Sequence, residues 1–219
     1  MGIIYRRAVD SGSGKWWREH GPACAGSAFS IRDYAEAILP PLRELDIRVL
    51  LEPGRFLVGN AGVLLTRVLY IKQTASKTFA IVDAGMNDLI RPALYQSYHE
   101  IAPVEDPKVG RDRRAHRETR RDSIRSTSMS KTNGLENVDI VGPVCESGDF
   151  FALDREMPEL HEGDLLSIMS AGAYGFVMAS NYNSRPLPAE VLVRGDKFAL
   201  IRKRQTWEDL VQKEIDLQW

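Results

Sequence analysis

The sequence is poor in the residues that hold metals or cross-link small secreted domains. Its 219 residues include two cysteines, Cys24 and Cys145, and four histidines, and no spacing among them matches a metal-ligand motif. The net charge of −1 gives no reason to expect a nucleic-acid or membrane partner. No apolar run is long enough to cross a bilayer, and the first residues contain no signal-peptide core. We therefore expect a cytoplasmic protein with reduced thiols and no metal site.

Two regions of different character follow one another along the chain. Residues 1–58 resemble the end of an α/β unit, with a helix capped by Ser30 and a buried apolar strand at residues 47–51. Pro40 and Pro41 are expected to kink or interrupt that helix. Residues 59–219 are rich in β-branched runs and predict a mostly antiparallel domain, a barrel or sandwich, with short helices. The expected fold class is thus α+β with two domains.

The second region predicts several individual elements. Residues 63–72 and 78–83 predict a hairpin, and residues 89–101 predict a helix with Pro92 in its first turn. Thr206 is expected to cap a final helix, since Asp209 follows three residues later. Further strands are expected at residues 138–141, 165–170, 189–193 and 198–202.

Residues 105–137 form a polar insert in the second region, with arginines at seven positions from 111 to 125. An arm that binds nucleic acid or an acidic partner is one interpretation. Acidic residues are interleaved and aromatic residues are absent, so we favour a solvated or disordered loop.

The sequence Glu52-Pro53-Gly54-Arg55 ends the expected strand of the first region. Pro53 fixes the backbone, and Gly54 lets backbone N–H groups approach a ligand closely. An acid and an arginine at the C-terminal end of a strand lie where α/β folds place chemistry. The alternative is an ordinary β-turn with two solvated charges.

Other candidate residues lie in the β-rich region. Cys145 follows a Gly-Pro turn and precedes Glu146, a neighbour that raises a thiol pKa, so the pair suits a protonated thiol that donates a proton. A buried core cysteine is the alternative. Tyr174 and Arg91 suit anion binding, or else a half-buried tyrosine and a surface salt bridge. His20, His99, His116 and His161 form no pattern and are expected on the surface.

Four segments occur together in the order EPGRFLVGNAGVLLTRV, FAIVDAGMNDLIRPALY, DIVGPVCESGDFFA and GAYGFVMASNYNSRPLPAEVLV. They resemble the C-terminal part of the diaminopimelate decarboxylase family, over about residues 30–210 apart from the insert. The resemblance implies a pyridoxal 5'-phosphate enzyme of fold type III that makes L-lysine from meso-2,6-diaminopimelate. It also implies a (β/α)8 barrel followed by a C-terminal β domain, in a homodimer whose subunits share each active site. Residues 1–58 would then be the end of the barrel.

The resemblance also implies roles for individual residues. Glu52 would face the pyridine nitrogen of the cofactor, with Pro53, Gly54 and Arg55 in the cofactor turn. Cys145 would reprotonate the α-carbon, and in the family it comes, with Glu146, from the other subunit. The implied substrate-binding residues are Arg55, Arg91, Tyr95, Glu146 and Tyr174, and Tyr174 would also lie near the cofactor phosphate.

One departure from the family concerns the Schiff-base lysine, which precedes the EPGR turn in the family. No lysine of this chain has such a position, so we expect a C-terminal portion of a longer enzyme, inactive in isolation. Two alternatives stay open. One is a related decarboxylase for ornithine, arginine or a carboxylated polyamine such as carboxyspermidine. The other is a non-catalytic dimerisation module.

Overall fold

The computed structural model describes residues 1–6, 31–45, 47–104 and 134–217. Its longest strand, β2 (Gly62–Gln73), organises the sheet. The first half of β2 pairs with β1 (Gly2–Arg6) and β7 (Leu165–Ile168), and the second half pairs with β3 (Thr78–Val82). A bulge between Val68 and Tyr70 lies where the neighbours change. The predicted hairpin of β2 and β3 is therefore confirmed.

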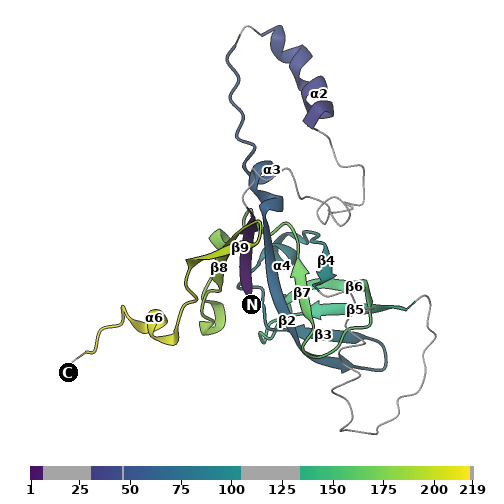
Figure 1. Ribbon diagram of the computed structural model, residues 1–219, viewed down its shortest axis with the longest axis vertical. Helices are drawn as coiled ribbons and strands as arrows, with labels where there is room; N and C mark the ends of the chain where they lie inside the picture. The colour runs from purple at the N-terminus through teal and green to yellow at the C-terminus, as the bar shows by residue number, and fades with distance from the viewer. Residues whose placement is uncertain (7–30, 46, 105–133, 218–219) are drawn as a thin grey trace.

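The remaining strands extend the sheet on both sides of β2 (Figure 1). On one side, β3 pairs with β5 (Leu135–Val141), which pairs with β6 (Phe150–Pro158). On the other, β1 pairs with β8 (Ala189–Arg194), and β8 with β9 (Lys197–Arg202), while β4 (Ile101–Pro103) pairs with β7. The β1–β8 and β3–β5 pairings are parallel and the others are antiparallel. The prediction of a mostly antiparallel domain is confirmed.

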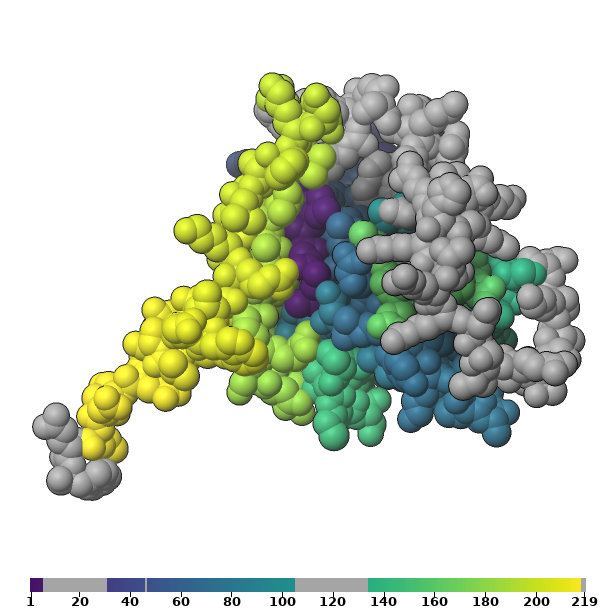
Figure 2. All heavy atoms as spheres, turned by 60° about the horizontal axis from the view of Figure 1, so that its bottom comes forward, coloured from purple at the N-terminus to yellow at the C-terminus, as the bar shows by residue number. Residues whose placement is uncertain are grey.

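The first strand lies inside this sheet. Residues 2–6 pair with β2 on one side and β8 on the other, although the sequence assigned them to the end of a barrel together with residues 31–58. Figure 2 shows this strand, in purple, between the yellow-green C-terminal strands and the blue residues that follow it. Ile3 is fully buried there, so burial of its side chain favours the pairing.

The core is formed by buried side chains of β2 and of the strands around it. Alternate residues of β2 are buried, as the period of two in a half-buried strand requires. Leu64 and Val68 from β2, Ile140 from β5, and Leu166 and Ile168 from β7 have no exposed surface. Burial of each such side chain contributes about 1.5–3 kcal/mol.

The helices are short and lie at the margins of the sheet. They are α2 (Ile31–Arg43), α3 (Gly54–Val58), η1 (Gly59–Ala61), α4 (Arg91–Tyr95), η2 (Phe176–Met178), η3 (Tyr182–Ser184) and α6 (Trp207–Val211). Figure 1 shows α2 standing away from the sheet, and α2 buries none of its side chains. No helix in the described ranges combines the length and apolar character that a bilayer crossing requires.

Four expectations about these elements need correction. α2 continues through Pro40 and Pro41 in its last turn, because the carbonyl groups that lose an N–H donor belong to the exposed Glu36 and Ala37, where water can bond to them. Residues 47–51 form no strand, and Leu50 is 75% exposed because no described element packs over it. The helix expected at 89–101 is limited to α4, since Gln96 adopts a left-handed conformation that ends it. Residues 135–137, assigned to the polar insert, begin β5.

Three strands were not predicted, β1, β4 and β6. The expected final helix is confirmed, and Thr206 and Asp209 form a reciprocal capping box at its start. Ser30, Cys24, His20, His116 and most of the polar insert lie outside the described residues.

Candidate active site

Three of the predicted site residues meet at α4. The guanidinium carbon of Arg91 lies 5.5 Å from the centre of the Tyr95 ring and 5.4 Å from that of the Tyr174 ring. Such distances allow cation–π attraction to both rings. Arg91 also donates a hydrogen bond to the Ser97 hydroxyl (3.4 Å). Tyr174 has a positive φ of 58° and is 45% exposed, so the fold holds its side chain at the surface beside Arg91.

Cys145 and Glu146 lie in a tight turn between β5 and β6. The Asp149 carboxylate organises this turn by accepting backbone N–H groups of Met86 and Val144, each at 2.6 Å. Cys145 is a free, exposed thiol, so the alternative of a buried core cysteine is wrong. The Glu146 carboxylate accepts hydrogen bonds from the Gly148 N–H (3.2 Å) and the Tyr182 hydroxyl (3.3 Å).

The Cys145 turn and α4 adjoin each other. A Cβ atom placed on Gly148 would lie 3.9 Å from the Cβ of Ala93 in α4 and 3.8 Å from Oε1 of Glu146. The structure thus places the turn that carries Cys145 and Glu146 beside the helix that carries Arg91 and Tyr95, although the two segments are far apart in sequence. A guanidinium, phenols, a carboxylate and a thiol are groups that can bind a ligand with both an anionic and a cationic group and supply a proton to it.

The EPGR turn is connected to the Tyr174 loop through η1, which follows the turn in the chain. η1 packs against the Tyr174 loop so closely that a Cβ on Gly172 would lie 2.0 Å from the Val58 carbonyl oxygen and 3.0 Å from that of Gly59. The Gly172 N–H donates to the Gly59 carbonyl at 3.0 Å. The backbone contact explains why glycine is needed at position 172.

The side chains of Glu52 and Arg55 are exposed, and no hydrogen bond or ion pair joins either to another residue of the described chain. A Cβ on Gly54 would meet no atom within 4 Å, so a ligand has open access to this backbone. With Tyr174, the donor set of a carboxylate, a guanidinium and a phenol fits a phosphorylated pyridine ring such as pyridoxal phosphate. No cluster of three or more potential metal ligands occurs in the described ranges.

A buried polar network supports both halves of the site. Arg185 donates from Nε to Asn87 Oδ1 (2.8 Å) and from Nη2 to the Asp83 carbonyl (2.6 Å). Its Nη2 lies 3.7 Å from Asp88 Oδ2, and Asp88 has no exposed surface. Burial raises the pKa of Asp88 to about 6, although the Gly85 N–H and Arg185 oppose the shift. Burial also raises the pKa of Asp149.

One histidine departs from the expectation. His161 is exposed, whereas His99 is only 4% exposed, with Nδ1 2.8 Å from the Met169 carbonyl oxygen. Because a carbonyl only accepts hydrogen bonds, Nδ1 carries the proton. Burial lowers the pKa of His99, and the nearby positive charges of Arg91 and Arg155 act in the same direction. The His99 hydrogen bond thus joins the segment before β4 to the segment that leads into the Tyr174 loop.

Sequence reasoning assigned no role to Asp88, Asp149, Tyr182 or Arg185. All four fall within the segments that resemble the family, but nothing in their spacing indicates that they meet. In a sequence, an acidic residue beside a strand or an arginine in a loop is most simply explained as an exposed surface charge. Their roles are visible only in the tertiary structure, because the burial of a charged group is informative only when its partners are known.

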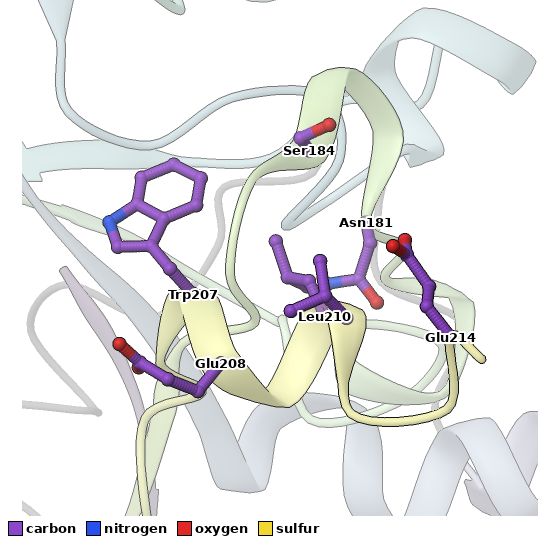
Figure 3. Close-up of a pocket in the computed structure, with 7 residues that line it drawn as sticks. Asn181, Ser184, Trp207, Glu208, Leu210 and Glu214 are labelled. Carbon is purple, nitrogen blue, oxygen red and sulfur yellow. The ribbon is translucent and has the colours of Figure 1, made fainter. Parts of the chain in front are cut away.

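A pocket in the described surface lies elsewhere. A pocket of about 500 Å³ separates α6 from the η3 loop (Figure 3). Its lining residues are Asn181, Ser184, Trp207, Glu208, Leu210, Val211 and Glu214. None of the predicted site residues lines it, so this pocket is separate from the candidate site.

The fold and this group of residues define a class. Residues 9–172 match the family model described as "Pyridoxal-dependent decarboxylase, C-terminal sheet domain", and the chain belongs to this family. Its relatives include curated diaminopimelate decarboxylases. One from Aquifex aeolicus is 44% identical over 85% of this chain and 39% of its own length, and one from Pseudomonas fluorescens is 45% identical over 96% and 44%.

Solved structures show the same relationship. The Helicobacter pylori diaminopimelate decarboxylase complexed with L-lysine is 41% identical, with a TM-score of 0.67, over 84% of this chain and 40% of that chain. The Aquifex aeolicus protein AQ1208 is 44% identical, with a TM-score of 0.68, over 85% and 40%. A Vibrio vulnificus lysine/ornithine decarboxylase complexed with cadaverine, at 19% identity and a TM-score of 0.55 over 74% of this chain and 38% of that chain, shares the fold. The chain thus spans about two fifths of the relatives it matches.

Proposed function

We propose that this chain forms the C-terminal domain of an enzyme that decarboxylates meso-2,6-diaminopimelate to L-lysine. The main support is the stacking of Arg91 between Tyr95 and Tyr174, beside the turn that carries Cys145 and Glu146. The substrate has a second amino-acid centre, with a carboxylate and an ammonium. The half-buried Arg91 suits that carboxylate, and the exposed Glu146, supplied by the other subunit, suits that ammonium.

The cofactor would supply an electron sink for the carbanion that remains when CO2 leaves. Glu52, Gly54, Arg55 and Tyr174 would hold it, and Arg55 would also bind a substrate carboxylate. Cys145 would give the proton of its Sγ–H to the α-carbon, and the resulting thiolate would regain a proton from solvent. An exposed thiol with this role suits the reducing cytoplasm. We propose a homodimer, in which Cys145 and Glu146 complete the site of the other subunit.

The test joins this chain to the portion of the Aquifex aeolicus relative that it does not cover. The hybrid is loaded with pyridoxal phosphate, and CO2 release is measured from meso-2,6-diaminopimelate and from ornithine. We expect turnover of diaminopimelate, and loss of about 10²-fold or more in a Cys145→Ala hybrid, as removal of a general acid typically causes. A dimeric hybrid that retains the cofactor yet releases no CO2 from diaminopimelate would refute the proposal, and turnover of ornithine alone would identify the related decarboxylase.

A further inference from the structure

The Glu146 carboxylate is held at both of its oxygen atoms. Oε1 accepts the Gly148 N–H at 3.2 Å, within the same turn. Oε2 accepts the Tyr182 hydroxyl at 3.3 Å, from a loop 36 residues further along the chain. The bond to Gly148 lies within the turn, so by itself it would let the carboxylate move together with the turn. The bond to Tyr182 fixes the carboxylate relative to a different loop.

The loop that carries Tyr182 is itself anchored. The Arg185 N–H donates to the Tyr182 carbonyl at 3.3 Å, and the Asn181 side chain donates to the Arg185 carbonyl at 2.9 Å. Asn183 and Ser184 both have a φ of 54°, which gives this loop a compact and specific path. The Arg185 side chain then reaches the buried network at Asn87 and fixes the loop to the protein interior.

The same network holds the Cys145 turn from the opposite side. Met86 donates its N–H to Asp149, and the adjacent Asn87 accepts from Arg185. Residues 86–87 therefore connect the support of the Cys145 turn to the support of the Tyr182 loop. The Tyr182–Glu146 hydrogen bond closes this ring of contacts at the surface, where the site lies.

We propose that Tyr182 is a positioning residue that orients the Glu146 carboxylate toward the distal ammonium of the substrate. The inference rests on the proposed function of Glu146. A phenol occupies one lone pair of a carboxylate and leaves others for an ammonium, which has three donors. Tyr182 thereby fixes the direction in which Glu146 accepts the substrate, and Arg185 fixes Tyr182.

The structure offers a readout of the contact without any substrate. The negative charge of Glu146, together with the hydrogen bond, raises the pKa of Tyr182. In the 219-residue chain, the ¹³Cζ signals of the tyrosines are followed by NMR through the alkaline range. We expect the pKa of Tyr182 to fall when Glu146→Gln removes the charge. Equal titration of Tyr182 in the unaltered chain and in Glu146→Gln would overturn the inference.

The functional consequence is measured in the hybrid enzyme described above. Tyr182→Phe removes a single hydroxyl, and Tyr70→Phe makes the same change outside the site. We expect Tyr182→Phe to raise KM for diaminopimelate about fivefold to tenfold and to change kcat less than about twofold, because the hydrogen bond acts on binding. Tyr70→Phe should change neither constant. An unchanged KM in an active Tyr182→Phe hybrid would overturn the inference, whereas an inactive unaltered hybrid refutes the proposed function and leaves the NMR titration to decide the contact.

Discussion

Replacement of Asp88 by asparagine should remove a large pH dependence from the stability of this domain. The Asp88 carboxyl group is fully buried and accepts hydrogen bonds from the Gly85 N–H (2.8 Å) and the Asn87 side chain (3.1 Å). Arg185 lies 3.7 Å away. These contacts compensate burial only in part, since the pKa of Asp88 rises from 3.8 to about 6.

The sign follows from the order in which the two states lose the proton. In the unfolded chain the Asp88 carboxyl ionises near pH 3.8, whereas in the folded chain it retains its proton to about pH 6. The contribution to stability is therefore complete below pH 3.8, falls as pH rises through 6, and is constant above. A difference of roughly 2 pKa units corresponds to about 3 kcal/mol, since each unit represents ~1.4 kcal/mol.

The assay is chemical or thermal unfolding of the unaltered chain and of Asp88→Asn between pH 4 and pH 7. Asparagine keeps an oxygen for the Gly85 N–H but does not ionise. The stability of the unaltered chain relative to the variant should fall by about 2.4 kcal/mol over this range, which corresponds to about 5–10 °C in Tm. His99 makes an opposing contribution, because its pKa is lowered and the stability that it gives the domain is lost as pH falls. This contribution is the same in both proteins and cancels in the comparison.

The matched control is Asp196→Asn, which makes the same chemical change in the exposed turn between β8 and β9. A difference between the unaltered chain and Asp88→Asn that stays constant from pH 4 to pH 7 would refute the reasoning. It would mean that Arg185 and the backbone donors stabilise the ionised carboxylate as well as water does.

Three further changes test the packing. Gly172→Ala should destabilise the domain by about 1–3 kcal/mol, because the new Cβ would lie 2.0 Å from the Val58 carbonyl oxygen; Gly54→Ala, at an open position, is the control in urea unfolding. Ile140→Ala should cost about 2–5 kcal/mol of unfolding free energy, since its side chain is fully buried, and a smaller loss would contradict the assigned core. Thr206→Ala should weaken α6 by about 1 kcal/mol through loss of its capping box, measured as faster amide hydrogen exchange in that helix, and unchanged exchange would argue against the cap.

Local sequence patterns were sufficient for several elements of this protein. Two β-rich runs separated by a short segment predicted the β2–β3 hairpin, because such runs are typical of neighbouring antiparallel strands. Side-chain capping predicted α6 at Thr206, since that interaction spans only three residues. The sequence also predicted Arg91, Cys145 and Tyr174 as site residues, since their segments resemble a known family in order, and these roles stay predictions.

Other features depended on contacts that no local pattern contains. The sequence predicted a buried strand at residues 47–51, yet an apolar run is buried only when another element covers it. Residues 2–6 look like the end of one unit but pair with strands that begin at residues 62 and 189. A strand exposes the same N–H and C=O groups to any neighbour, so its partner is chosen by the whole fold.

The support of the site was likewise decided by tertiary structure alone. Asp88, Asp149, Tyr182 and Arg185 are ordinary polar residues in sequence, and their roles arise from hydrogen bonds and an ion pair between segments about 36 to 102 residues apart. The sequence by itself predicted which chemical groups the candidate site contains. The tertiary structure decided which of them meet, because burial selects only those charged groups whose partners the fold has brought within hydrogen-bonding distance.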